Sequence, residues 1–444
     1  MSKTVDVTLY GAVGDGATDD GAAIGRAVAA LASGDLLHFP DRPRGYSIGD
    51  TVIALPADAA LNGLVGLAQQ TPPAGAGFRI AGDRRGIVSG SQGNVFDNGR
   101  TLYHYMISCY TGNLIFPRGS TDGLLVWERP TANSHWVACL SSVDPDLGPV
   151  HVLHDITQPN PREAYIDPCM VELADGSLHV VYQYLSPGMS ALQMQSSTDG
   201  GHTWGHVETI APPDAGHEYS DPFFLRLANP DRVILCWRDH DRYGRRDTVH
   251  RTAFSDDGLV SLSIPTVATP VSGAASAGRI IDDSRGSIYE AADGSLVLLY
   301  SRKVGVAPAE VWARRISRIG APTADPVRLA TVPRVSGDHI QIGVDPIVTR
   351  LGDGTFALYF TAMDMSVGPS SYYGELHLML SDDGSPESFA HDRTIILAEN
   401  VGGGYGRPWP VCLPGGDVAL IMSAAPAGGR ADIIVIRHYH ACTH

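Results

Sequence analysis

Five charged residues occupy an equivalent position in five similar stretches of the sequence. Each stretch contains a β-rich run, a turn of the Asp-Gly type and an apolar run. Aligning the stretches on their turns and counting back eight residues gives Asp167, Asp221, Arg285, Asp345 and Arg407. Such a group could cleave a glycosidic bond, because one carboxylic acid protonates the leaving oxygen and a second carboxylate attacks or activates water. Arginine would hold acidic or hydroxyl groups of the substrate.

A second set of polar residues follows at the ends of the next apolar runs. These residues are Gln183, Arg238, Asp239, Arg302 and Asp364. Charged side chains are seldom buried unless they are paired or functional. We therefore assign Asp167, Asp221 and Asp345 as candidate catalytic residues. The candidate substrate-binding residues are Arg285, Arg407, Arg238, Arg302, Asp239 and Gln183. The alternative is that these charges simply pair with one another and tie neighbouring elements together.

Tyr405 is a further catalytic candidate. It lies in the glycine-rich stretch GGGYGRP, which leads directly into Arg407. A phenol at this place could act as a nucleophile, stack on a sugar ring or pack within the loop.

The stretches themselves predict the elements that position these residues. Clear copies begin at IDPCMVELADG, SDPFFLRLANP, RGSIYEAADG, VDPIVTRLGDG and RPWPVCLPGG, with a shortened first copy at NLIFPRGSTDG. Their spacing of about 50 to 60 residues leaves room for four strands in each unit, which is the period of a β-propeller blade. Six copies predict an all-β, six-bladed β-propeller over residues 96–444. Because strands alternate in direction within a blade, both sets of polar residues should lie at one mouth of the central channel.

The second copy continues into Ser197-Thr198-Asp199-Gly200-Gly201-His202-Thr203-Trp204, and partial versions begin at Ser255 and Ser381. The sequence S-x-D-x-G-x-T-W resembles the Asp box of sialidases and related propellers. In that motif Asp and Gly form a tight hairpin and the aromatic residue packs between sheets. We therefore interpret Asp199 as structural. The resemblance implies a sialidase-like propeller glycosidase.

Sialidases use a tyrosine nucleophile supported by a glutamate, and three arginines that bind the sialic acid carboxylate. The resemblance assigns Tyr405, Arg285 and Arg407 to matching places. The nearest candidate for the third arginine is Arg118, in Phe116-Pro117-Arg118. Here Arg follows the Pro, whereas the FRIP-like sequence of sialidases has it before the Pro. A strict sialidase activity is therefore not expected.

Residues 1–95 carry a different pattern and predict a small N-terminal α+β cap or attachment segment. A helix is expected after Thr18-Asp19-Asp20, where the acidic pair would cap its first turn. This segment resembles the opening of pectate-lyase-like β-helix proteins, which include many phage tailspikes. The matching residues are Tyr10 to Gly16, Thr18 to Asp20, Ile24, Phe39-Pro40 and Tyr46 to Ile48. The likeness implies an association with a phage or prophage tail, where depolymerases are commonly trimeric, so a homotrimer is one expectation.

The composition limits the partners. The formal net charge of -16 argues against nucleic acid, which needs a basic face. No apolar run is long enough to span a membrane, and no signal peptide is visible. We therefore expect synthesis in the cytoplasm, with release or incorporation into a virion. The six cysteines show no metal-ligand spacing and are interpreted as free, mostly buried thiols. No motif indicates a metal or another cofactor.

These observations predict a glycoside hydrolase acting on a microbial or host polysaccharide or oligosaccharide. The first alternative is a polysaccharide lyase with a Tyr/His pair on the same scaffold, for which His151, His154, His217, His240 and His250 are available. The second is a glycan-binding or structural tail protein without catalysis.

Overall fold

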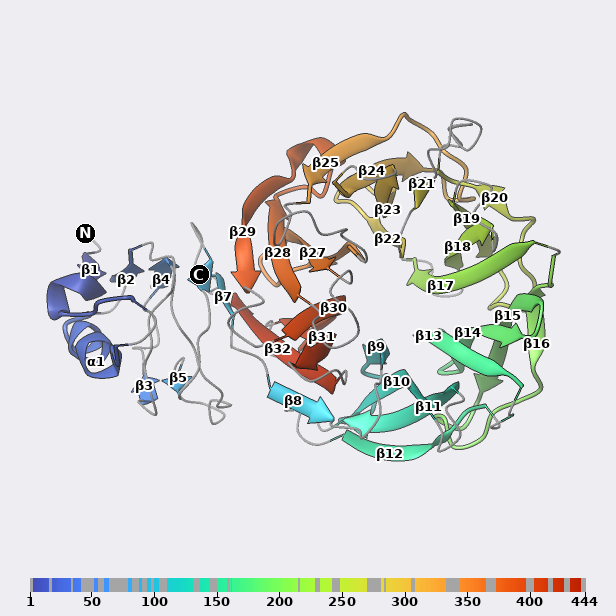
Figure 1. Ribbon diagram of the computed structural model, residues 1–444, viewed down its shortest axis with the longest axis horizontal. Coiled ribbons are helices and arrows are strands. Elements are labelled where there is room, and N and C mark those ends of the chain that lie inside the picture. The colour runs from blue at the N-terminus through green and yellow to red at the C-terminus, as the bar shows by residue number, and fades with distance from the viewer. Residues whose placement is uncertain are drawn as a thin grey trace.

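The structure of the 444-residue chain is a computed structural model dominated by β-strands arranged around a central axis (Figure 1). It describes residues 3–15, 18–32, 35–40, 52–54, 60–63, 79–81, 88–89, 94–96, 100–103, 110–130, 136–143, 150–157, 160, 162–214, 216–227, 232–241, 248–269, 281–282, 285–304, 308–332, 344–364, 373–396, 403–413, 418–426 and 432–440. This arrangement confirms the prediction of an all-β propeller.

Five antiparallel sheets, named here blades 1 to 5, follow one another along the chain. Blade 1 contains β9 (Tyr110–Ile115), β10 (Gly123–Pro130), β11 (Trp136–Val143) and β12 (Val150–Asp155). Blade 2 contains β13 (Ala164–Glu172), β14 (Leu178–Ser186), β15 (Met189–Ser197) and β16 (Glu208–Ala211). Blade 3 contains β17 (His217–Arg226), β18 (Val233–Asp241), β19 (Val249–Ser255) and β20 (Thr266–Val267).

Blade 4 contains β21 (Ile281–Asp282), β22 (Ser287–Glu290), β23 (Leu296–Val304), β24 (Glu310–Ile316) and β25 (Val327–Thr331). Blade 5 contains β26 (Ile347–Arg350), β27 (Phe356–Asp364), β28 (Tyr373–Ser381) and β29 (Ala390–Ile396), with the short 3-10 helix η3 (Pro386–Ser388) before β29. In blades 1 to 3 the first strand (β9, β13 or β17) lies nearest the axis and the last lies at the periphery, and in blade 4 β22 is the innermost strand (Figure 1).

The remaining sector of the propeller is a composite sheet, called here the closing sheet. It joins β30 (Gly403–Cys412), β31 (Val418–Pro426) and β32 (Asp432–His440) to β6 (Val88–Ser89), β7 (Asn94–Phe96) and β8 (Arg100–Tyr103). Both β7 and β8 pair with β32 in antiparallel register. The prediction of six equivalent blades is therefore corrected to five regular blades and one composite sheet. The physical reason is that an unpaired strand edge exposes N–H and C=O groups, and here strands from the N-terminal part of the chain cover the edge of β32.

The N-terminal segment forms a parallel sheet beside a helix. Strands β1 (Thr4–Asp6), β2 (Leu36–Phe39) and β4 (Ala60–Gly63) pair in parallel, and β3 (Val52–Ala54) pairs antiparallel with β5 (Arg79–Ala81). A short 3-10 helix, η1 (Val7–Tyr10), precedes α1 (Gly21–Ala29). Asp19 accepts a hydrogen bond from the Gly21 amide, while Asp20 accepts bonds from the amides of Val13 and Gly14. The predicted division at residues 95 and 96 stays a prediction.

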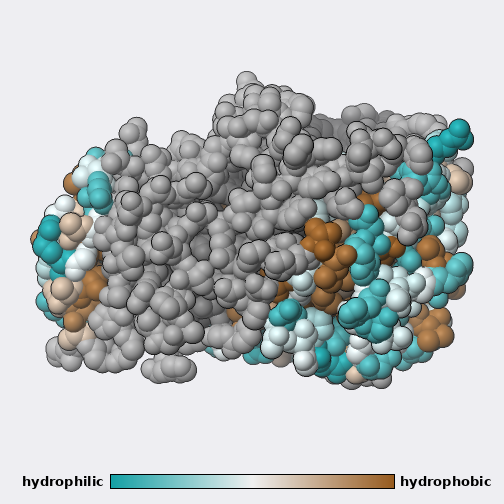
Figure 2. All heavy atoms as spheres, turned by 90° about the horizontal axis from the view of Figure 1, so that it is seen from below, coloured by the Kyte–Doolittle hydropathy of each residue, from teal (hydrophilic) through white to brown (hydrophobic). Residues whose placement is uncertain are grey.

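The interior of the propeller is apolar, and its turns are fixed by short hydrogen-bonded loops. The largest core cluster joins buried side chains from the blades and the closing sheet. Figure 2 shows that hydrophobic residues are interspersed with hydrophilic ones over the described part of one outer face. Three cysteines, Cys139, Cys169 and Cys236, are buried, whereas Cys412 is exposed. Within the described part of the chain, no helix is long and apolar enough to cross a membrane.

Candidate active site

The innermost strands share an irregularity at the aligned charged position. The pairing register shifts between Ile166 and Cys169 in β13, between Ser220 and Phe223 in β17, and between Gly406 and Trp409 in β30. The residues with left-handed backbone at this position are Asp167 (φ 52°), Asp221 (φ 52°), Asp345 (φ 39°) and Arg407 (φ 53°). Each is followed by proline, which disfavours the right-handed helical conformation in the preceding residue.

A positive φ is uncommon outside glycine, and each such residue costs on the order of 1–3 kcal/mol. Recurrence of this conformation at four charged residues indicates that the fold maintains a strained local geometry there. We name Asp167, Asp221, Arg285, Asp345 and Arg407 the charged ring. Asp167 lies near the start of β13, so the end of the propeller where β13 begins is called the site end, and the opposite one the hairpin end.

Arg407 brings together carboxylates from two different blades. Its Nη1 donates a hydrogen bond to Oδ1 of Asp167, and its Nη2 lies 3.6 Å from Oδ1 of Asp221. Arg238 approaches Asp221 from the other side, with its Nε 3.5 Å from Oδ2, and also donates to the Ser220 hydroxyl at 3.0 Å. The structure therefore brings Asp167, Asp221, Arg407 and Arg238 together.

Glu128 is a member of this site that the sequence reasoning missed. It lies near the end of β10, is only 5% exposed, and its Oε2 accepts a hydrogen bond from the Asp167 amide at 2.6 Å. The rule that selected Gln183 and Arg238, which takes the polar residue at the end of the second strand, would have found Glu128 in the first copy. The shortened form of this copy obscures its match to the other five.

Two contacts hold blade 1 against blade 2 and thereby place Glu128 beside Asp167. The Asn113 side chain donates to the Met170 carbonyl at 2.8 Å and accepts from the Met170 amide at 2.6 Å, so it extends the pairing of β13 towards β9. A Cβ on Gly112 would collide with the backbone carbonyls of Val126 and Pro168. The absence of a side chain at residue 112 therefore allows the backbone after Asp167 to approach blade 1 closely.

The carboxyl groups of the site have pKa values displaced in opposite directions. Burial, followed by the negative charge of Asp167, raises the pKa of Glu128 to about 8. Burial also raises the pKa of Asp167 and that of Asp345, although the positive charge of Arg407 opposes both shifts. Burial alone would raise the pKa of Asp221 as well. The positive charges of Arg238 and then Arg407 outweigh this effect and lower the pKa of Asp221 to about 2. A neutral carboxylic acid and an ionised carboxylate thus coexist near pH 7.

Arg285 adds a buried cation to the charged ring. It is 6% exposed, and its guanidinium carbon lies 5.4 Å from the centre of the Trp409 ring, in a cation–π contact. Its positive charge acts against burial at Asp167, Asp221 and Asp345, because it favours the ionised form of each carboxyl.

Other predicted residues lie in separate networks. Asp239 is buried and binds two partners of blade 3, His217 through Nδ1 at 2.6 Å and Arg251 through Nε at 2.5 Å. The Gln183 amide lies 3.3 Å from Glu218 Oε1 and 3.4 Å from the Ser190 hydroxyl. None of these partners belongs to the charged ring, so these contacts do not join Asp239 or Gln183 to it.

The places of three other sequence candidates also follow from the strands. Arg302 is half-buried on β23, opposite Glu310 in the register. Tyr405 lies on β30, but its side chain falls outside the described residues. Arg118 follows β9 and contacts Glu172 and the Leu173 carbonyl, at the end of β13. Arg118 therefore lies at the hairpin end. It cannot join Arg285 and Arg407 as the third substrate-binding arginine that the sialidase resemblance suggested.

Among the described residues, no group of three or more His, Cys, Asp or Glu side chains is placed to hold a metal ion. The arrangement that is present, carboxyls of opposite protonation beside guanidiniums, suits acid–base chemistry on a neutral or anionic substrate.

The fold resembles that of known glycosidases. No protein-family model matches the sequence, and no curated protein matches it. Among solved structures, an α-L-arabinofuranosidase of Fusarium graminearum from family GH93, in complex with arabinobiose, is 12% identical with a TM-score of 0.55, over 77% of this chain and 97% of that chain. An α-L-arabinanase of Penicillium chrysogenum, also with arabinobiose, is 12% identical with a TM-score of 0.54, over 76% and 97%.

A sialidase of Trypanosoma rangeli in complex with sialic acid is 11% identical with a TM-score of 0.51, over 79% of this chain and 59% of that chain. At such low identity these likenesses show the fold alone. The protein is thus a β-propeller whose architecture is similar to that of an α-L-arabinofuranosidase, an α-L-arabinanase and a sialidase.

Proposed function

We propose that the protein is a glycoside hydrolase with its active site at the site end of the propeller. The observation that carries this proposal is the group formed by Glu128, Asp167 and Asp221, in which burial keeps one carboxyl protonated while two arginines keep another ionised. Glycoside hydrolysis uses a protonated and an ionised carboxyl on opposite sides of the scissile bond. The saccharides bound in the structurally similar enzymes support a saccharide as the substrate here.

In the proposed reaction Glu128 is the general acid. Its pKa near 8 leaves it protonated at neutral pH, so it can donate a proton to the departing glycosidic oxygen. Asp221 remains ionised and either attacks the anomeric carbon or activates the attacking water. Asp167 donates its amide N–H to Glu128 and shares Arg407 with Asp221, so its charge is coupled to both of the other carboxyls.

Two observations favour hydrolysis over the alternative lyase reaction. The described site consists mainly of carboxyls and guanidiniums, and two of the five histidines considered for a lyase have partners outside this site. His154 accepts a hydrogen bond from the Trp204 indole, and His217 binds Asp239.

The experiment is incubation with a panel of arabinans, bacterial polysaccharides and sialylated glycans, with two readouts. New reducing ends or free sugar without ultraviolet absorbance support hydrolysis, whereas absorbance from an unsaturated uronic acid indicates a lyase. Glu128→Gln should lower turnover of a cleaved glycan by about 100- to 10,000-fold, the usual contribution of a positioned general acid. Glu208→Gln on the exposed edge of blade 2 is the matched control. Normal cleavage by Glu128→Gln would reject this assignment, and binding of a glycan without cleavage would favour a glycan-binding or structural role.

We further propose that residues 1–95 serve as an attachment segment in a phage or prophage tail. The likeness of residues 10–48 to tailspike openings supports this, as does the parallel pairing of β1, β2 and β4. A homotrimer, release from the cell and incorporation into a virion belong to the same proposal. Light scattering coupled to size-exclusion chromatography tests the trimer, and a mass corresponding to a single chain would remove its support.

A further inference from the structure

Three equivalent hairpins, called here the aspartate hairpins, follow the third strands of blades 2, 3 and 5. In blade 2, Asp199 accepts hydrogen bonds from the Thr203 amide at 2.9 Å and from the Thr203 hydroxyl at 2.6 Å. In blade 3, Asp257 accepts the same two bonds from Ser261, at 3.0 and 2.5 Å. The backbone hydrogen bond that follows each loop is also repeated. The Gly205 amide donates to the Ser196 carbonyl in blade 2, and the Ser263 amide donates to the Phe254 carbonyl in blade 3.

The residue that follows this shared loop faces the preceding blade. In blade 2 it is Trp204, which packs against the core cluster between blades 1 and 2 and donates its indole N–H to His154 of blade 1 at 3.0 Å. The corresponding aromatic residue of blade 5 is Phe389. Its ring packs edge-on against the ring of Tyr289 of blade 4, with 6.2 Å between the two ring centroids. In both cases an aromatic ring fills the junction between two blades.

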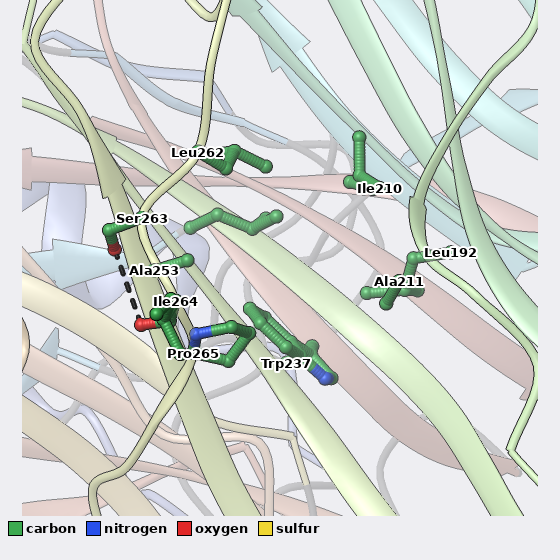
Figure 3. Close-up of a pocket in the computed structure, with 10 residues that line it drawn as sticks. Leu192, Ile210, Ala211, Trp237, Ala253, Leu262, Ser263, Ile264 and Pro265 are labelled. Atoms are coloured by element: carbon green, nitrogen blue, oxygen red, sulfur yellow. Dashed lines mark hydrogen bonds between the residues drawn. The ribbon is translucent and has the colours of Figure 1, made fainter.

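Blade 3 has Leu262 at the position of Trp204, and a cavity of about 240 Å³ lies beside it. Leu192, Ile210 and Ala211 line the cavity from blade 2. The lining from blade 3 consists of Leu235, Trp237, Ala253, Leu262, Ser263, Ile264 and Pro265. Figure 3 shows the Leu262 and Ile210 side chains on one side of this space and the Trp237 indole on the other. Ile264 is 90% exposed, so the cavity reaches the outer surface of the propeller.

The size and chemistry of this cavity restrict what it can hold. Apolar cavities of roughly 150 Å³ bind benzene, whereas sites for drug-sized ligands occupy about 300–1,000 Å³. Nine of the ten lining residues have hydrophobic side chains, and Ser263 is the exception. The buried Trp237 indole N–H has no hydrogen-bond partner among the described residues, so the lining also includes one unsatisfied donor.

We propose that this cavity is a binding site for a small, neutral aromatic molecule of one or two rings. The aromatic ring of the bound molecule lies at the junction of blades 2 and 3. It takes the same place there as Trp204 takes between blades 1 and 2, and as Phe389 takes between blades 4 and 5. Burial of an aromatic ring between two apolar sheets supplies the driving force. The site is distinct from the charged ring, because its residues belong to outer strands, to the second strand of blade 3 and to the loop after β19.

The test measures binding of indole to the whole protein by calorimetry. We expect saturable binding to the unmodified protein and to Val260→Ala, a control at an 85% exposed residue outside the cavity. Leu262→Trp should weaken binding by at least about tenfold because its own indole occupies the space. The N–H resonance of Trp237, assigned with Trp237→Phe, should shift on addition of indole.

Ala211→Leu fills the cavity from blade 2 and serves as a second blocking variant if Leu262→Trp does not fold. Glucose, a polar probe of similar size, should give no saturable shift of the Trp237 resonance. Absence of indole binding, or binding that both blocking variants leave unchanged, would overturn the proposal.

Discussion

The displaced pKa of Glu128 should be visible in the thermal stability of the protein. A carboxyl whose pKa is higher in the folded than in the unfolded state stabilises the fold fully below the unfolded value. That stabilisation is lost as the pH rises towards the folded value. For Glu128 this loss spans the pH range between its ordinary pKa of 4.5 and its raised pKa of about 8 in the folded protein. Stability should therefore fall as the pH is raised across neutrality, and replacement by an amide, which does not titrate, should remove this part of the fall.

The magnitude follows from the same two values. Between pH 6 and pH 9, a shift from 4.5 to about 8 corresponds to a loss of about 3 kcal/mol in the free energy of unfolding. With about 2.1 cal/mol/K of unfolding entropy for each of the 444 residues, this loss lowers the Tm by about 3 °C. In the Glu128→Gln variant the new side-chain carbonyl can still accept the Asp167 amide hydrogen, so packing is retained.

The assay is calorimetry or circular dichroism of the unmodified protein, Glu128→Gln and the control Glu208→Gln in the same buffers at pH 6, 7, 8 and 9. The fall in Tm should be about 3 °C smaller in Glu128→Gln than in the other two proteins. Parallel curves for all three proteins would refute the assignment of Glu128 as a neutral acid, whatever the substrate of the enzyme.

Three other changes have expected outcomes. Gly112→Ala should lower the free energy of unfolding by about 1–3 kcal/mol, measured by urea titration, because its Cβ overlaps backbone carbonyls at the junction of blades 1 and 2. Arg407→Lys should reduce kcat/KM by about 10- to 100-fold, since a single ammonium cannot replace the two contacts of the guanidinium; unchanged kinetics would contradict this role. Asp199→Ala should lower the Tm but leave cleavage of a saturating substrate unchanged, because the hairpin lies at the other end of the propeller from Asp167.

Several features of the site were within reach of sequence reasoning. In a propeller every repeat presents the same position at the same end of the axis, so alignment on the turns was enough to group Asp167, Asp221 and Arg407. The same alignment could have found Glu128. It could not show which members touch, because Arg407 and Asp167 lie 240 residues apart and meet only when the blades close around the axis.

The local pattern also could not distinguish a residue of the site from one that serves its own blade. Asp239 looks like Arg238 in the sequence, yet successive side chains of a strand point to opposite faces, and Asp239 binds His217 and Arg251. Arg118 likewise resembles a site residue until the strand directions place it at the hairpin end.

The sequence by itself determined the strands, the turns and the repeat of this protein, because these depend on residues close together in the chain. Only the tertiary structure decided the composite closing sheet, the protonation of Glu128 and the cavity beside Leu262. The closing sheet joins strands from the N-terminal part of the chain to strands from its C-terminal part. The pKa of Glu128 depends on burial and on charges from several parts of the propeller. The cavity exists because two sheets meet where one hairpin has leucine in place of an aromatic residue.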